Sequence, residues 1–304
     1  MPRNEISSRS KGLLLVLTGV LIISFDALLV RLAHTQTGNV IFWRGIFMLL
    51  SLTVVELIRN RRTPVRAVLQ GGGPAAQSAL HYGLGGILFV SAVMFTKVAN
   101  AVVIISLAPL FAAALTRIFN IDVVTLRTWL AIISAICGVA IVFHGSLGTG
   151  DMLGNLIALL AALNIGSNLT LLRSNPRLDP LPLVALGGGI MAVLALPWAA
   201  PWDMHQQSYL VLALMGLIQM PAALVLIGTS TRYLPSPEVS LFLLVETISA
   251  PILVWLFLAE EPPGATFLGG GIVITTLVLY FWLGLRESRQ VLPSSDGVPA
   301  WPKR

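Results

Sequence analysis

The feature that most constrains this chain is a series of apolar segments, each long enough to cross a lipid bilayer. A helix needs about 20 consecutive apolar residues for that crossing. We expect ten such spans, at residues 12–33, 39–58, 76–96, 100–118, 127–144, 152–172, 181–200, 207–228, 236–258 and 265–285. Of the 304 residues, 56% are hydrophobic and only 11% are charged, which is too few charges to cover a soluble surface of this size. The sequence therefore predicts an integral membrane protein.

The spans are continuously apolar rather than alternating, so we expect helices and not the strands of a membrane barrel. Short loops leave no room for a domain outside the membrane. Arg3, Arg9 and Lys11 precede the first span, as in a signal peptide. No small-x-small cleavage site follows, so we interpret this segment as the first membrane helix. The predicted fold class is an all-α membrane protein.

The second half of the chain repeats the first. Gly12 to Arg31 and Gly154 to Arg173 both read as apolar helices that close on an arginine, 142 residues apart. Phe119-Asn120-Ile121-Asp122 has a counterpart in Phe257-Leu258-Ala259-Glu260, 138 residues later. Internal duplication of a hydrophobic chain is typical of transporters, in which two related bundles expose one central site alternately to each side.

Five helices per repeat is an odd number, so the second repeat enters the membrane from the opposite side. The sequence thus predicts two inverted five-helix repeats, 1–148 and 149–288, followed by a cytoplasmic tail, 289–304. Such halves can exchange conformations and thereby turn an outward-facing state into an inward-facing one.

Lysine and arginine are distributed very unequally between the two expected faces. If the N-terminus is cytoplasmic, sixteen of them lie on the cytoplasmic side, Arg31 and Lys97 lie on the other, and Arg44 lies inside a span. The positive-inside rule therefore places both termini in the cytoplasm. This topology and the attraction to anionic lipid explain the net charge of +6, so we expect membrane lipid and no nucleic acid among the partners.

Polar groups at membrane depth are costly and usually face the interior of a bundle, so they mark candidate sites. Glu246, near the middle of the ninth span, is the first candidate: it could exchange a proton, meet a substrate ammonium, or do each in turn. Asp26 and Arg44 lie at similar depth, and a structural ion pair is as good an explanation as a role in proton or ion coupling or gating. Arg31 could also form an ion pair with Asp26.

Further candidates for substrate binding lie on the third, sixth and eighth spans. His81 and Tyr82 open the third span, where a histidine can gate, bind a carboxylate or stay structural. Asn164 and Asn168 share a face of the sixth span, and Gln219 is central in the eighth. Amides suit the two charges of a zwitterion, but they also join helices to each other.

Prolines mark where backbone carbonyls become available. Pro109, Pro221 and Pro251 release the carbonyls of residues four positions earlier in the fourth, eighth and ninth spans. Kinked helices with free carbonyls near mid-membrane are typical of transporter sites, although a kink packed against its neighbours is an equal alternative for each proline.

Several short motifs resemble the paired EamA domains of the drug/metabolite transporter superfamily. They are Trp43-Arg44, Leu107-Ala108-Pro109-Leu110-Phe111 with Asp122, and Arg232-Tyr233-Leu234-Pro235 with Glu260. The resemblance covers nearly the whole chain, and the layout is similar to that of the bacterial YddG-type amino-acid exporters. It departs from the family at Asp122, where a Glu is usual, and at Thr247, which occupies the position of the second repeat that is equivalent to Pro109.

The resemblance implies an exporter of aromatic and other neutral amino acids in the bacterial inner membrane. Its cavity would be formed mainly by the first, third, fourth, sixth, eighth and ninth spans. The expected partner is a small-molecule substrate, the protein would act as a monomer with a dimer as the alternative, and no cofactor or metal is expected.

Three other functions remain in competition. Efflux of lipophilic or quaternary cations needs a buried acid and aromatic walls, which Glu246 and Phe242 could supply. Exchange of phosphorylated metabolites needs cationic groups, for which only Arg44, Lys97 and Arg232 are available. A membrane enzyme would need a nucleophile and base or a metal set, and neither the histidine spacing nor the single cysteine, Cys137, provides one, so we expect a protein that is not an enzyme.

Overall fold

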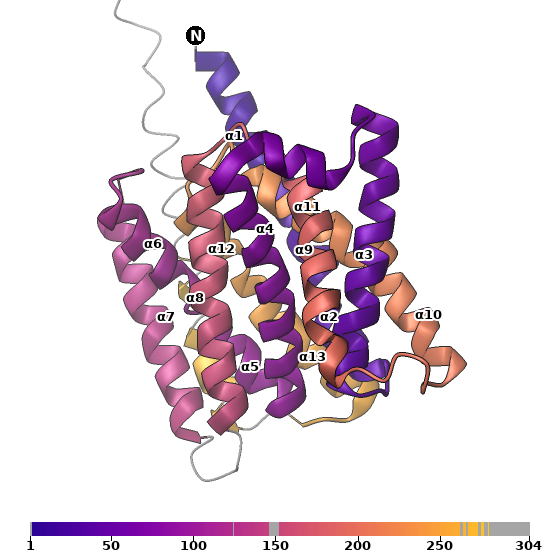
Figure 1. The fold of residues 1–304 in the computed structure, drawn as a ribbon. Coiled ribbons are helices and arrows are strands. Elements are labelled where there is room, and N and C mark those ends of the chain that lie inside the picture. The colour runs from indigo at the N-terminus through magenta and orange to yellow at the C-terminus, as the bar shows by residue number, and fades with distance from the viewer. Residues whose placement is uncertain are drawn as a thin grey trace, which may run out of the picture.

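The computed structural model describes residues 2–123, 125–145, 152–261, 264–265, 267–272, 275–276 and 279. Within them every regular element is a helix (Figure 1). Eight helical segments of this part of the chain are long and apolar enough to cross a membrane: Ser8–Leu32, Thr37–Asn60, Pro64–Phe95, Val98–Ile118, Met152–Ser174, Pro180–Trp198, Gln206–Ser230 and Ser236–Leu258. Seven of them match the expected boundaries to within four residues.

The helices follow one another with short connections. In chain order they are α1 (Pro2–Ile23), α2 (Asp26–Leu32), α3 (Thr37–Asn60), α4 (Pro64–Phe95), α5 (Val98–Ile105), α6 (Ala108–Ile118), α7 (Leu126–Gly145), α8 (Met152–Ser174), α9 (Pro180–Ala195), α10 (Gln206–Leu214), α11 (Met220–Ser230), α12 (Ser236–Phe242) and α13 (Leu244–Leu258). The expected fifth span coincides with α7, whose apolar part is the shorter stretch Leu126–Gly138. The expected tenth span falls largely outside the described residues, and the tail falls wholly outside them.

The start of α4 differs from the expectation, because the helix begins twelve residues before the expected third span. Thr63 caps it by accepting a hydrogen bond from the Arg66 backbone N–H at 3.3 Å. The first turns lie across one face of the molecule, and the chain then turns inward at Gly72 (Figure 1). Gly72 has φ of 68° and ψ of −156°, a conformation that a side chain would disfavour. This surface helix does not stand out in the sequence, because Val65 and Leu69 are too few to form an apolar span.

Four spans are interrupted along their length. The first divides into α1 and α2 at Ser24 and Phe25, the fourth into α5 and α6 at Ser106 and Leu107, and the ninth into α12 and α13 at Leu243. The eighth contains a π-helical turn, Met215–Gln219, between α10 and α11. Pro109 and Pro221 each stand at the start of the helix that follows an interruption, as their missing N–H permits. Pro251 lies inside α13.

The two halves run in opposite directions. α1 leaves the face that carries the N-terminus, called the N face below, whereas α8 starts at the opposite side, called the far face (Figure 1). Helices of one half pack mainly on those of the other: α1 on α11, α3 on α9 and α4 on α8. Glycines allow the closest approach. A Cβ atom added to Gly45 would lie 2.5 Å from the carbonyl oxygen of Gly188, and one added to Gly188 would lie 2.7 Å from that of Gly45.

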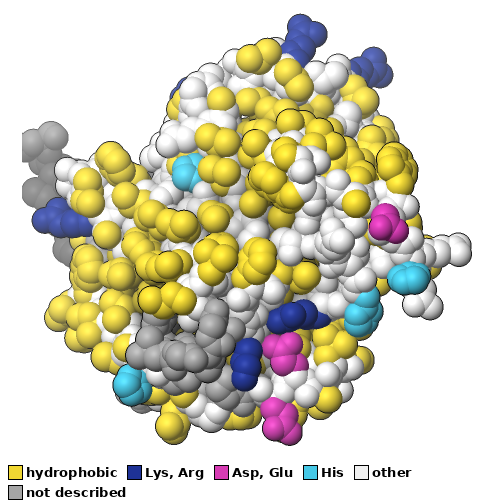
Figure 2. Space-filling model, turned by 60° about the horizontal axis from the view of Figure 1, so that its bottom comes forward, with side chains coloured by type: hydrophobic (Ala, Val, Ile, Leu, Met, Phe, Trp, Pro, Cys, Tyr) yellow, Lys and Arg dark blue, Asp and Glu magenta, His cyan; other side chains and the backbone are white. Residues whose placement is uncertain are grey.

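The flanks of the molecule are apolar. Figure 2 shows hydrophobic side chains over most of the visible surface, with charged side chains in only a few places. Large side chains such as Leu14, Leu21 and Ile58 are more than half exposed. An apolar surface of this extent would be unfavourable in water, and it is what a chain embedded in lipid presents to its surroundings.

Candidate functional site

A cavity lies between the two halves. Its lining comes from α1 to α6 and from α8, α9, α11, α12 and α13. The six spans that the resemblance implied all contribute, and α3 and α9 of the second and seventh spans contribute as well. The cavity has a volume of about 110 Å³, which holds several waters or one small organic molecule.

Three ionisable side chains, Asp26, Arg44 and Glu246, form a charged cluster on the cavity wall. Arg44 Nη1 lies 3.1 Å from Asp26 Oδ2, and both side chains are almost fully buried. Glu246 lies within electrostatic reach of both residues. With all three groups ionised, the charged cluster carries one net negative charge.

Glu246 is the member of the charged cluster that forms no ion pair with another described residue, whereas Asp26 and Arg44 pair with each other. It is 7% exposed, and its Oε1 atom has no hydrogen-bond partner among the described residues. It stands in the first turn of α13, immediately after the interruption at Leu243. The first turn of a helix favours a negative charge, because unpaired N–H groups point toward it. The interruption of the ninth span therefore presents a carboxylate to the cavity.

The opposite end of the cavity is polar but neutral. Asn164 donates from Nδ2 to the His81 carbonyl oxygen at 2.9 Å, and its Oδ1 lies 2.7 Å from His81 Nδ1. Because Oδ1 is an acceptor, His81 Nδ1 is the donor, which leaves Nε2 free of this contact. Ser78 donates to Asn168 Oδ1 at 2.7 Å, and the Tyr82 side chain lies beside Asn168. These five residues join α4 to α8 and are called the amide seam below.

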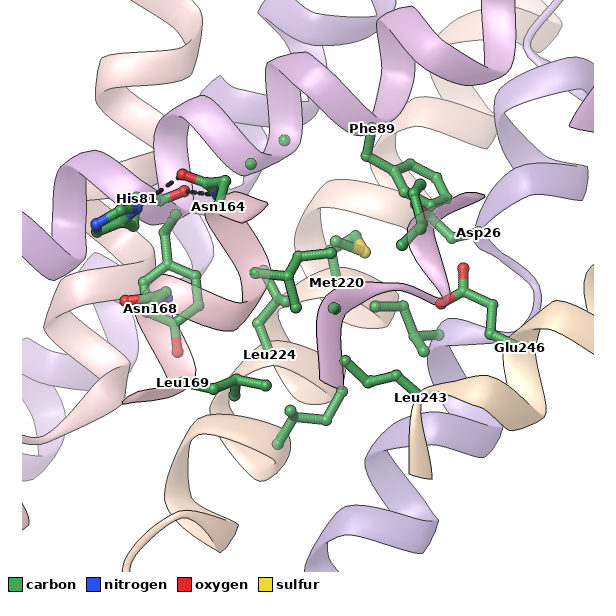
Figure 3. A pocket seen from close by; sticks show the side chains of 18 of the residues that line it. Asp26, His81, Phe89, Asn164, Asn168, Leu169, Met220, Leu224, Leu243 and Glu246 are labelled. Atoms are coloured by element: carbon green, nitrogen blue, oxygen red, sulfur yellow. Dashed lines mark hydrogen bonds between the residues drawn. The ribbon is translucent and has the colours of Figure 1, made fainter. Parts of the chain in front are cut away.

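Figure 3 separates the two ends clearly. Asp26 and Glu246 lie on one side of the cavity and His81, Asn164 and Asn168 on the other, with Met220, Leu224, Leu243 and Leu169 between them. A ligand that fills the cavity thus meets charged groups at one end, an apolar middle, and neutral hydrogen-bonding groups at the other end.

Two of the expected substrate-binding residues are not among those that line the cavity. Gln219 donates from Nε2 to the Ile22 carbonyl oxygen at 3.1 Å and lies beside Asp26, so it supports the charged cluster from behind. Phe242 is 4% exposed and packs in the apolar core with Val239 and Leu234.

The three prolines do not line the cavity either, but Ala108 and Met220, which precede Pro109 and Pro221, do. These two prolines shape the backbone near the wall without forming its surface. Arg31 does not form an ion pair with Asp26; it lies 3.6 Å from Glu260, at the far face.

The apolar middle of the cavity does not stand out in the sequence, because Met220, Leu224 and Leu243 look like any other membrane-span residues. Ser78, whose hydroxyl binds Asn168 across the two halves, was also not predicted. A signal was available: Ser78 lies one turn before Tyr82, on the helix face already singled out.

The inverted halves, the lipid-facing flanks and the cavity between the halves define a multi-pass helical membrane protein built as a small-molecule carrier. The profile of the EamA-like transporter family matches residues 10–144 and again residues 152–282. The chain therefore belongs to this family, within the drug/metabolite transporter superfamily, and carries two copies of its repeat. The expected EamA membership and the expected multi-pass membrane protein are thereby confirmed.

A protein of known crystal structure shares the fold, with a TM-score of 0.72 and 13% sequence identity over 91% of this chain and 99% of that one. At this identity the likeness concerns the fold alone. No curated protein sequence matches the chain.

Proposed function

We propose that this protein is a secondary carrier of the bacterial inner membrane that exports amino acids, aromatic and other neutral ones, by alternating access to the central cavity. In this proposal the chain is not an enzyme, it spans the membrane ten times, and both termini lie in the cytoplasm. The two copies of the family repeat and their inverted arrangement support alternating access.

Glu246 carries the proposal. A buried carboxylate with an unpartnered oxygen is costly unless something completes it, and a substrate ammonium would do so. Asp26 is less available, because Arg44 already neutralises it. The ammonium of the amino acid therefore binds at Glu246.

Arg44 supports a zwitterion rather than a simple cation. The guanidinium lines the same cavity as Glu246, and its Nε atom has no hydrogen-bond partner among the described residues. A guanidinium is well suited to a carboxylate. A positive and a negative group side by side match the adjacent charges of an amino acid, whose side chain then extends along Met220 and Leu224 toward the amide seam.

The same cavity argues against phosphorylated metabolites. Arg44 is the one lysine or arginine in the cavity lining within the described residues. Neither Lys97 nor Arg232 lines the cavity. A phosphate with up to two negative charges would meet the carboxyl groups of both Asp26 and Glu246 there.

Efflux of organic cations is the second candidate function. It is favoured by the net negative charge of the charged cluster and by the largely apolar lining. It requires only the carboxylate, whereas an amino acid requires Arg44 as well.

Counterflow into liposomes separates the two candidates. Liposomes that contain the purified carrier are loaded with an unlabelled neutral amino acid, and labelled phenylalanine and leucine are added outside. Competition by the methyl ester, which lacks the carboxylate, and by the N-acetyl derivative, which lacks the ammonium, reveals which charges are recognised. A zwitterion carrier rejects both analogues, while a cation carrier accepts the ester.

The Glu246→Gln variant tests the assignment of the ammonium site. Loss of a charge-assisted hydrogen bond, about 1.5–3 kcal/mol, raises the concentration for half-maximal counterflow roughly tenfold or more. Glu261→Gln, at an exposed carboxyl outside the cavity, is the matched control. Wild-type rate and affinity in Glu246→Gln would show the assignment to be wrong.

A further inference from the structure

Four ion pairs join the two halves among the described residues. The pairs Arg9–Glu238 and Arg59–Asp179 have arginines that are more than half exposed. The other two are less exposed, and one lies at each face. At the N face, Arg173 and Asp122 form a bidentate pair, with Nε 2.7 Å from Oδ2 and Nη2 3.2 Å from Oδ1. At the far face, Arg31 Nε lies 3.6 Å from Glu260 Oε2. We call these the N-face pair and the far-face pair.

The two pairs are counterparts in the repeat. Arg173 follows Arg31 by 142 residues, and Glu260 follows Asp122 by 138. In each pair the arginine ends the first span of its own half, and the acid follows the fourth span of the other half. An operation that exchanges the halves therefore exchanges the N-face pair with the far-face pair.

The arginines also hold equivalent backbone. Arg31 donates from Nη2 to the Thr96 carbonyl oxygen at 3.1 Å. Arg173 donates from Nη1 to the carbonyl oxygens of Thr231 and Arg232, at 3.3 and 3.5 Å. Thr96 lies directly before the fourth span, and Thr231 and Arg232 lie before the ninth, so each arginine fixes the entrance to the corresponding broken span.

A second set of contacts repeats the same correspondence. A Cβ atom added to Gly154 would lie 2.6 Å from the Phe95 carbonyl carbon and 2.7 Å from Thr96 Cβ. One added to Gly12 would lie 2.6 Å from Tyr233 Cβ and 3.0 Å from Leu234 Cγ. Each glycine begins the first span of one half and packs on the loop before the fourth span of the other. Each of these two loops therefore lies between two contacts. One is the glycine at the start of the first span of the other half, and the second is the arginine at the end of the first span of the loop's own half.

The geometry points to these pairs as two reciprocal gates: breaking the N-face pair opens the cavity toward the N face, and breaking the far-face pair opens it toward the far face. Each pair bridges the halves, so the halves cannot separate at one face while its pair is intact. The inference rests on the alternating access of the proposed function, but not on the identity of the substrate.

The test measures access to the cavity rather than transport. Cys137, the single cysteine, is replaced by serine, and Leu224→Cys places one reporter thiol on the cavity wall. In liposomes of known orientation, a membrane-impermeant maleimide is applied from one side at a time, and the labelling rate is measured in this background and in its variants.

Asp122→Asn should raise labelling from the N face by roughly two- to fivefold, the size expected for loss of a partly exposed ion pair, and should lower labelling from the far face. Glu260→Gln should produce the opposite pattern. Arg173→Gln breaks the N-face pair from the other half and must reproduce the shift of Asp122→Asn. Asp122→Glu keeps the pair and should label as the background does.

The control is Arg62→Gln. It removes an ion pair of 2.7 Å between Arg62 and Glu56, which lie in the same half, and Glu56 keeps its hydrogen bond from Asn60. Its labelling should match the background. Unchanged labelling in Asp122→Asn and Glu260→Gln, or a rise at one face without a fall at the other, overturns the reciprocal gates. Failure of amino-acid counterflow with the reciprocal pattern intact would reject the proposed substrate and leave the gates in place.

Discussion

Arg44 Nη1 lies 3.1 Å from Asp26 Oδ2 in the interior of the protein, and each side chain is only 1% exposed. Two charges taken from water are stable there only while they compensate each other. The pair holds α2 against α3 and forms most of the charged cluster, so stability and the candidate site depend on the same contact.

Removing one partner should therefore be costly. Asp26→Asn leaves the Arg44 guanidinium with Glu246 as its remaining carboxylate neighbour, and we expect a loss of about 3–5 kcal/mol of stability, the usual effect of breaking a buried pair. Thermal unfolding in detergent measures it. The double variant Asp26→Asn/Arg44→Gln should lose less than Asp26→Asn alone, and additive losses would speak against the pairing.

The crossing of α3 and α9 predicts a steric effect. Gly45→Ala places a methyl group 2.5 Å from the Gly188 carbonyl oxygen, where backbone must move. We expect destabilisation by about 1–3 kcal/mol. Gly73→Ala is the matched control because its added methyl group meets nothing within 4 Å. Thermal unfolding should show a lower midpoint for Gly45→Ala only.

The amide seam predicts coupling between two spans. Ser78 and Asn168 bind each other at 2.7 Å while buried, so Ser78→Ala leaves the Asn168 oxygen with one partner fewer, and Asn168→Ala removes the acceptor. A double-mutant cycle on the free energy of unfolding should give a coupling of about 0.5–3 kcal/mol. A coupling near zero would mean that the hydrogen bond does not form.

A contact between the two halves can be trapped covalently. Ser134 Oγ lies 2.6 Å from Thr276 Oγ1, and the two residues are 142 positions apart in the sequence. In a Cys137→Ser background, Ser134→Cys with Thr276→Cys should form a disulfide under mild oxidation, visible as a mobility shift on a non-reducing gel. The neighbouring Ile133 is 54% exposed, so Ile133→Cys with Thr276→Cys is the control and should not cross-link.

Much of the fold follows from the sequence, because lipid leaves few alternatives for an apolar chain. The length of each apolar run set the spans closely, as Ser236–Leu258 illustrates. Interruptions were harder to predict. Pro109 marked the break in the fourth span, but the break at Leu243 in the ninth span has no adjacent proline, because the position equivalent to Pro109 is Thr247. Both halves therefore have the break in the helix, but only the first half has the proline.

Part of the cavity lining was predictable from the sequence, but the contacts were not, and Gln219, Phe242 and the three prolines do not line the cavity. Burial cost identified Glu246, Asp26 and Arg44, since an ionisable group in a span needs a reason to be there. The same rule could not tell that Gln219 turns toward the Ile22 carbonyl rather than into the cavity. Its direction depends on the π-helical turn Met215–Gln219, which shifts the helix face and leaves no clear pattern in the sequence.

The side chains of the N-face pair and of the far-face pair are about a quarter exposed, 24 and 25% at the N face and 28 and 29% at the far face. Dissolved ions can therefore reach both pairs, and each pair meets the electrolyte of its own compartment. Because salt weakens accessible ion pairs, the equilibrium between the state open to the N face and the state open to the far face depends on the difference in ionic strength across the membrane.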